Sequence, residues 1–145
     1  MSADVHASTF RIRGTALTET DDGYTLTSPY VSIAITKGTA TGSFENTTSY
    51  LAMPSGSQLS VNVLTDGYCL INEYTDSMDN HYQSYIGFYS ADDAAASLTI
   101  TGATGTIDGT NVNLAYSSSS LSTFSFTVNA DVKITALSLI YGKLA

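Results

Sequence analysis

Segments in which apolar and polar residues alternate recur along the whole chain, separated by turn residues. In the clearest one, Val31, Ile33 and Ile35 alternate with Ser, Ala and Thr, and the same period recurs at 59–63 and 124–128. Successive side chains of a strand point to opposite faces, so this alternation places one apolar row on one face of a sheet. Short strands repeated in this way are typical of an all-β sandwich or barrel.

The predicted fold is therefore all-β, a two-sheet antiparallel β-sandwich that is jelly-roll-like. More than a quarter of the chain is Ser or Thr and two residues are Pro, a composition that favours strands and turns over helices. One of the turns is predicted at 21–23, Asp-Asp-Gly. The apolar rows predict a core that includes Ile33, Ile35, Leu59, Val61, Leu70, Leu98, Ile100, Leu114, Phe124, Phe126, Ile134, Leu137 and Leu139.

Three features interrupt the regular pattern. The apolar row changes phase between Ile134 and Leu137, which predicts a β-bulge near residues 135–136. Residues 68–74 form a nearly continuous apolar run, which predicts one strand that is covered on both faces. The best helical signal is a single turn at 91–96, where two aspartates precede three alanines.

The chain has 145 residues, of which 43% are hydrophobic, enough to bury a core. No linker and no change of composition divides it, so residues 1–145 are predicted to form one domain. The first strand signal comes at 10–13, where Arg11 and Arg13 alternate with apolar residues. We therefore expect residues 1–8 to be a flexible or partner-bound N-terminal segment.

The charge balance excludes several classes of partner. There are 13 acidic and 5 basic residues, the formal net charge is -8 and the pI is about 4.2. Binding to a phosphate backbone needs clustered Lys and Arg, so no nucleic-acid partner is expected. No apolar stretch approaches the roughly 18 residues of a membrane span, and no secretion signal is visible, so no membrane insertion is expected.

Catalytic chemistry has few candidates in this sequence. A nucleophile needs a base that a third group orients, and the chain holds only His6 and His81, with no G-x-S-x-G motif. Cys69 lies in an apolar run and is predicted to be a buried thiol. Glu73 is the one glutamate inside a predicted strand, where an outward-facing role is favoured over a glycosidase acid. We expect a non-enzymatic protein without catalytic residues.

No cofactor is expected, and calcium is the one alternative that the sequence leaves open. The segment 76–80 is short and rich in the oxygen ligands that calcium prefers, although it lacks the spacing of an EF-hand. Its candidate ligands are Asp76, Asp79 and Asn80. The favoured interpretation is a solvated acidic loop with no metal.

The segment 72–90 holds the densest group of aromatic and planar amide side chains in the chain. Sugar-binding modules lay a sugar ring on an aromatic side chain and bond its hydroxyls with Asp, Asn, Gln or His, while protein interfaces also favour Tyr. In the alternative interpretation, Tyr85 and either Phe88 or Tyr89 belong to the core and the rest is a loop. The candidate residues for a glycan or protein interface are Tyr74, Asp79, Asn80, His81, Tyr82 and Gln83.

The order of segments also carries a resemblance. The motifs are VSIAITKG at 31–38, GSQLSV at 56–61, GTNVNL at 109–114 and DVKITALSLIY at 131–141. Over residues 24–142 the chain resembles jelly-roll β-sandwich modules of gut-bacterial surface proteins and of the phages that infect such bacteria. The resemblance implies a sandwich fold and a display role, and it assigns no catalytic residue. The chain departs from it in the tyrosine-rich middle, so the candidate site is not inherited from it.

Two functions follow as expectations. The first is a structural and attachment protein of a virion surface, such as a capsid decoration, head-fibre or tail-fibre component, with protein partners in that assembly. Such a protein is expected to form a homo-oligomer or to join a lattice, and to contact host glycan. The second is a carbohydrate-binding module of a secreted or cell-surface bacterial protein. The expected location is the virion surface in the first case and extracellular or on the bacterial surface in the second.

Overall fold

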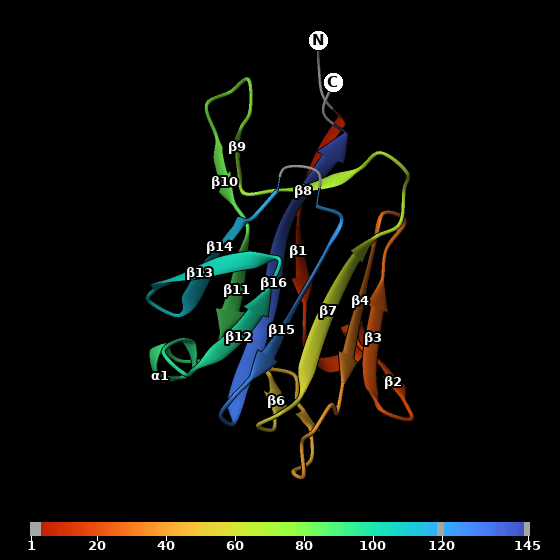
Figure 1. Ribbon diagram of the computed structural model, residues 1–145, viewed down its shortest axis with the longest axis vertical. Helices are drawn as coiled ribbons and strands as arrows, with labels where there is room; N and C mark the ends of the chain where they lie inside the picture. The colour runs from red at the N-terminus through yellow and green to blue at the C-terminus, as the bar shows by residue number, and fades with distance from the viewer. Residues whose placement is uncertain (1–3, 119–120, 144–145) are drawn as a thin grey trace.

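A computed structural model of the chain describes residues 4–118 and 121–143, and in it the alternating segments pair into antiparallel sheets (Figure 1). Ile33 lies opposite Val61, which in turn lies opposite Phe124, so the apolar rows of neighbouring strands share one face. The resulting six-stranded sheet has the order β12 (Leu98–Thr101), β15 (Thr123–Val128), β7 (Gln58–Val63), β4 (Val31–Thr36), β3 (Gly23–Thr27) and β2 (Thr18–Thr20).

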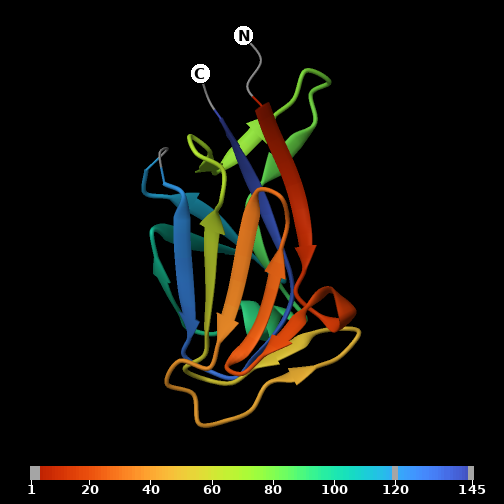
Figure 2. The ribbon, with the colours of Figure 1, turned by 90° about the vertical axis from the view of Figure 1, so that its right-hand side faces the viewer.

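An eight-stranded sheet is built around the long strand β16 (Val132–Lys143). Along each edge of β16, two shorter strands pair with it one after the other. They are β1 (Asp4–Arg11) and β6 (Leu51–Met53) on one edge, and β8 (Cys69–Ile71) and β11 (Tyr85–Phe88) on the other. Figure 2 shows β1 running alongside β16. The remaining strands are β5 (Glu45–Asn46) beside β6, and β14 (Asn111–Tyr116) and β13 (Ala103–Asp108) beyond β11.

The core lies between the two sheets. The chain passes repeatedly from one sheet to the other, as from β12 to β13 and from β14 to β15, and the inward faces form one hydrophobic cluster. Every predicted core residue is buried except Leu98 and Ile100, which are half-buried because β12 is an edge strand. The prediction of an all-β, two-sheet antiparallel sandwich is therefore confirmed.

Two of the three predicted interruptions of the strand pattern are present, the β-bulge and the helical turn. Gly87 pairs with Ala136, whereas its neighbour Phe88 pairs with Ile134, so Thr135 is the extra residue of a β-bulge that keeps both halves of β16 facing the core. The predicted helical turn is α1 (Ala91–Ala94), and the Ser90 side chain caps it by accepting a hydrogen bond from Asp93 N. A 3₁₀ turn, η1 (Gly14–Ala16), follows β1. Within the described ranges, no helix is long and apolar enough to cross a membrane.

The prediction for the N-terminal segment is corrected by strand β1. Residues 4–8, expected in a flexible or partner-bound segment, pair with β16 in a register that begins with Asp4 opposite Lys143. The alternation is obscured there because the row facing inward contains a histidine. The His6 ring lies 4.4 Å from the Tyr30 ring and 5.3 Å from the Tyr141 ring, measured between centroids. Residues 1–3 lie outside the described part of the chain.

The apolar run at 68–74 is divided between two strands, which corrects the prediction of a single one. β8 ends at Ile71, and a separate hairpin begins at Glu73. Asn72 turns the chain between them: its carbonyl accepts a hydrogen bond from Ser84 N at 2.9 Å, and its Oδ1 accepts one from Tyr116 N at 2.6 Å. The break therefore depends on partners that are distant in the sequence.

Candidate functional site

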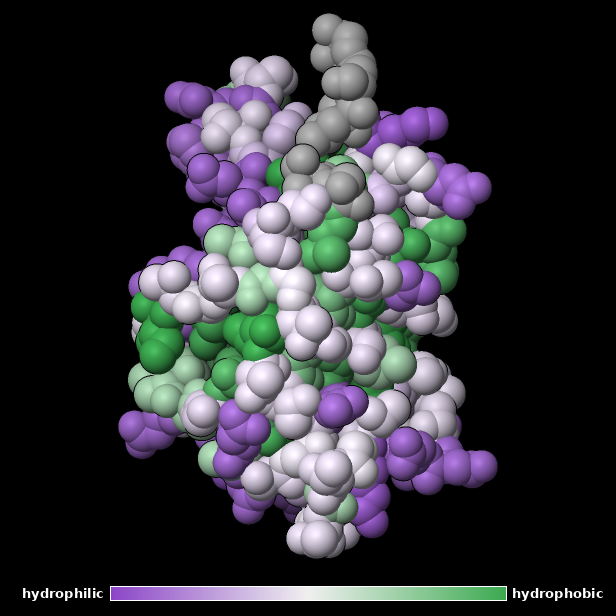
Figure 3. Space-filling view, viewed as in Figure 1, coloured by the Kyte–Doolittle hydropathy of each residue, from purple (hydrophilic) through white to green (hydrophobic). Residues whose placement is uncertain are grey.

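The residues predicted to bind a ligand come together in one β-hairpin. β9 (Glu73–Thr75) and β10 (His81–Gln83) form a two-stranded sheet of their own, in which Tyr74 lies opposite Tyr82. The hairpin projects from the sandwich at the end where β1 begins and β16 ends (Figure 1). In the space-filling view it forms a largely polar lobe above the body of the molecule (Figure 3). We call Glu73–Gln83 the tyrosine hairpin.

The Asp76 carboxylate braces the turn of the tyrosine hairpin. Asp76 Oδ1 accepts hydrogen bonds from Met78 N at 2.8 Å and Asn80 N at 2.9 Å, and Oδ2 accepts one from Asn80 Nδ2 at 3.0 Å. The Tyr82 hydroxyl lies 3.3 Å from the same Oδ2 and donates to it. Asp79 has a φ of 69°, a left-handed conformation that Asp tolerates better than most residues. The turn is thus fixed by its own side chains.

This bracing bears on the candidate calcium site. Of its three candidate ligands, Asp76 uses both carboxylate oxygens for hydrogen bonds within the turn, and the Asn80 amide donates to that carboxylate. Asp79 is exposed. Among the described residues, no group of three or more His, Cys, Asp and Glu side chains is placed to hold a metal ion. Calcium binding by Asp76 would therefore compete with the hydrogen bonds that order the turn.

The bracing hydrogen bonds predict a pH-dependent turn. They lower the pKa of Asp76 below its ordinary value of 3.8, the Asn80 side chain contributing most, followed by the Asn80 and Met78 amides and the Tyr82 hydroxyl. Because the pKa is lowered in the folded state, the stabilisation is complete above the unfolded pKa of about 4 and is lost as the pH falls through the folded value. In an NMR titration, we expect the Met78 and Asn80 amide signals to move only below about pH 4.

The Asp76→Asn variant is the control for this titration, because it removes the titrating group and should abolish the low-pH movement of both amide signals. A carboxyl signal of Asp76 that titrates at or above 3.8 would contradict the assignment of the bonds.

The two tyrosines of the hairpin form a stacked pair. Their ring centroids lie 6.3 Å apart with an interplanar angle of 21°. Tyr74 is half-buried, Tyr82 is 38% exposed, and the nearby Met78 is 79% exposed. The negative charge of Asp76 raises the pKa of Tyr82, which therefore stays a neutral hydrogen-bond donor at physiological pH. The hairpin thus presents aromatic and thioether surface from a fixed scaffold.

The other predicted ligand residues are mostly engaged within the protein. Gln83 Nε2 lies within 3.0 to 3.1 Å of the carbonyl oxygens of Asn72, Ser84 and Leu114, so this amide anchors the hairpin to the sandwich. His81 Nδ1 lies 2.9 Å from Thr75 Oγ1 across the hairpin. The structure therefore brings all the predicted site residues together, but it gives most of their polar groups structural partners.

The remaining residues singled out from the sequence lie elsewhere. Phe88 is buried, Tyr85 is half-buried, and Tyr89 is 54% exposed beside α1. Cys69 is buried, its Sγ lies 3.5 Å from Gly142 O, and burial raises the pKa of its thiol. This environment favours the predicted inert thiol over a nucleophile.

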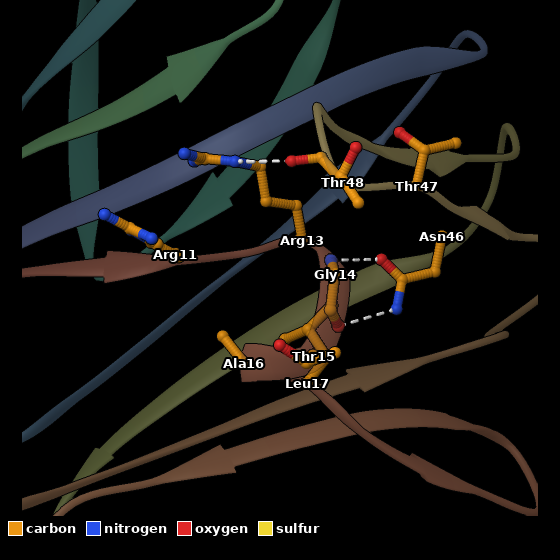
Figure 4. A pocket seen from close by; sticks show the side chains of 9 residues that line it. All are labelled: Arg11, Arg13, Gly14, Thr15, Ala16, Leu17, Asn46, Thr47 and Thr48. Atoms are coloured by element: carbon orange, nitrogen blue, oxygen red, sulfur yellow. Dashed lines mark hydrogen bonds between the residues drawn. The ribbon is translucent and has the colours of Figure 1, made fainter.

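A second site lies where β1 leaves the eight-stranded sheet. A cavity of about 720 Å³ is lined by residues from 11–17 and 46–48 (Figure 4). Hydrogen bonds join its two walls: Asn46 Oδ1 accepts from Gly14 N at 2.6 Å, Asn46 Nδ2 donates to Gly14 O at 3.0 Å, and Arg13 Nε donates to Thr48 O at 3.1 Å. We call this cavity the arginine pocket.

The arginine pocket was not predicted from the sequence. The alternation at 10–13 puts Arg11 and Arg13 on the face opposite the apolar residues, and both arginines line the pocket. The available signal was the concentration of two of the chain's five cations within three residues. The opposite wall, 46–48, lies more than thirty residues away and carries no signal that links it to these arginines.

Comparison with known proteins adds no further assignment, because no protein-family model, no curated protein and no solved structure matches this chain.

Proposed function

We propose that the protein is a non-enzymatic structural and attachment protein of a virion surface, such as a capsid decoration, head-fibre or tail-fibre component. In this proposal the tyrosine hairpin docks on a neighbouring protein chain of the assembly. The first partner to test is another copy of this chain. The observation that carries the proposal is the 79% exposure of Met78 at the tip of a projecting, internally braced hairpin.

Two properties of the hairpin support a protein partner. Met and Tyr are enriched at protein interfaces, and Met78 and Tyr82 are both exposed on the hairpin. The turn is already ordered by Asp76, so little conformational entropy is lost when the tip is bound. By contrast, the Gln83 and Asn80 amides, which would bond sugar hydroxyls, already have partners within the protein.

The experiment is a measurement of molar mass by size-exclusion chromatography with light scattering over a range of protein concentrations. We expect the wild type to form a trimer or larger assembly, and the Met78→Ser/Tyr82→Ser double variant to elute at the monomer mass of 15.3 kDa. The matched control is Ile107→Ser, which removes a hydrophobic side chain that is 58% exposed on β13, away from the hairpin. This variant should assemble like the wild type.

The second candidate function is a carbohydrate-binding module of a secreted or cell-surface bacterial protein. It is favoured by the near-parallel rings of Tyr74 and Tyr82, which offer an aromatic face for stacking. A wild type that stays at 15.3 kDa at every concentration would count against the first proposal. Glycan binding that is lost in Tyr82→Ser would then establish the second.

A further inference from the structure

We propose that the arginine pocket binds a carboxylate-bearing saccharide, with Arg11 and Arg13 binding the carboxylate. The site lies on the sandwich and not on the tyrosine hairpin, and it shares no residue with it. The inference is therefore independent of the proposed docking of the hairpin.

The pocket concentrates positive charge in an acidic protein. The chain has 13 acidic and 5 basic residues, and two of the basic ones line this cavity, with no carboxylate among the lining residues. In the described part of the chain, the one ion pair joins His6 to Asp4, so neither arginine has a carboxylate partner. Both arginines carry positive charge into one cavity, and a bound anion would offset that charge.

The two arginines lie against neighbouring residues of β16. Arg13 Nη1 donates to Thr135 O at 2.9 Å, and Arg11 pairs with Ala136, the next residue of β16. Figure 4 shows the Arg13 guanidinium in front of β16, where it bonds Thr135 O, and the Arg11 side chain farther to the left in the same view. Arg13 is held by two carbonyl oxygens, whereas the exposed Arg11 guanidinium has no hydrogen bond among the described residues. A carboxylate accepts hydrogen bonds from paired N–H donors. The fixed Arg13 guanidinium and the free Arg11 guanidinium can both supply such donors.

The pocket also has hydroxyl groups and space for the uncharged part of such a ligand. Thr15 and Thr48 line it and are exposed, and neither hydroxyl has a hydrogen bond among the residues described. A volume of about 720 Å³ lies within the range of small-molecule sites and exceeds what an inorganic oxyanion fills. The hydrogen bonds of Asn46 to Gly14 hold the two walls in place before a ligand arrives.

Lys133 and two tyrosine rings form an aromatic surface on the same stretch of β16. Lys133, two residues before the Thr135 carbonyl that holds Arg13, places its Nζ 4.9 Å from the Tyr50 ring centroid and 5.8 Å from that of Tyr89. Tyr89 is 54% exposed. A saccharide longer than one ring could extend from the arginines onto this surface and stack on it.

The test is a calorimetric titration at low salt with three probes: galacturonate, galactose and acetate. Galactose has the same ring without the carboxylate, and acetate has the carboxylate without the ring. We expect galacturonate to bind at least about tenfold more tightly than either of the others, and its affinity to fall as salt is added. Equal binding of galacturonate and galactose, or of galacturonate and acetate, would overturn the proposal.

The variant is Arg11→Gln, because Arg11 makes no side-chain hydrogen bond in the described chain and its replacement should leave the melting temperature unchanged. We expect it to weaken galacturonate binding by about tenfold or more. The matched control is Lys143→Gln, which makes the same change of charge at the far end of β16 and should bind like the wild type. Unchanged affinity in Arg11→Gln, or equal loss in both variants, would refute the role of the pocket.

Discussion

The Phe126→Ala variant is expected to lower the free energy of unfolding by about 3 to 5 kcal/mol. Phe126 is 1% exposed and lies between Leu59 of β7 and Ile100 of β12, its neighbours across the six-stranded sheet. Truncation leaves a cavity that the sheet cannot close, because β15 and β7 are each hydrogen-bonded to neighbouring strands on both sides. Since a domain of this size is stabilised by only about 5 to 15 kcal/mol, denaturant unfolding monitored by tyrosine fluorescence will resolve the effect.

The matched variant for Phe126 is Leu98→Ala on the same sheet. Leu98 is half-buried on the edge strand β12, so its truncation exposes the gap to water and should lower the free energy of unfolding by about 1 to 2 kcal/mol. Similar losses in the two variants would mean that Phe126 does not occupy the centre of the core.

A second large effect is expected for Gly23→Ala. Gly23 follows the Asp21–Asp22 turn, has a φ of 154°, and lies between Thr20 of β2 and Thr36 of β4. A Cβ atom there would overlap the Ile35 carbonyl oxygen and lie 2.9 Å from its carbon. Both are backbone atoms of a central strand that cannot move aside. Strain and overpacking together should lower the free energy of unfolding by about 3 kcal/mol or more.

Gly109→Ala is the control for the conformational part of this effect. Gly109 also has a positive φ, 64°, but a Cβ atom there would meet nothing within 4 Å. Thermal and denaturant unfolding of this variant should show a loss of about 1 to 2 kcal/mol, from the left-handed backbone alone. If both alanine variants lose the same amount, the contact with Ile35 does not determine the stability of Gly23.

The alternation of the sequence was sufficient to predict the sandwich and its core. Val31, Ile33 and Ile35 are all fully buried, and the phase change near residue 135 corresponds to the bulge at Thr135. These features were predictable because side-chain direction along a strand depends on local geometry alone. The β1 strand was missed at its start because His6 occupies an inward position that an apolar residue would otherwise mark.

The candidate residues of the hairpin were predicted as a group. Which of their polar groups are free to bind a ligand was not predicted. The structure places Tyr74 opposite Tyr82 in one hairpin. The role of Gln83 depends on the carbonyl of Leu114, thirty-one residues away, and the end of β8 depends on the bond from Tyr116 to Asn72. A hydrogen bond between distant residues leaves no periodic signal in the sequence, so neither could be inferred from it.

The sequence by itself determined which residues face the core, because burial of an apolar row is decided strand by strand. Tertiary structure alone decided the arginine pocket. β1 and β6 share one side of β16, and at their junction Arg13 meets Thr48. The contact between Arg13 and Thr48 depends on the positions along β16 at which β1 and β6 end. Those positions are set by the register of the whole sheet and not by local sequence.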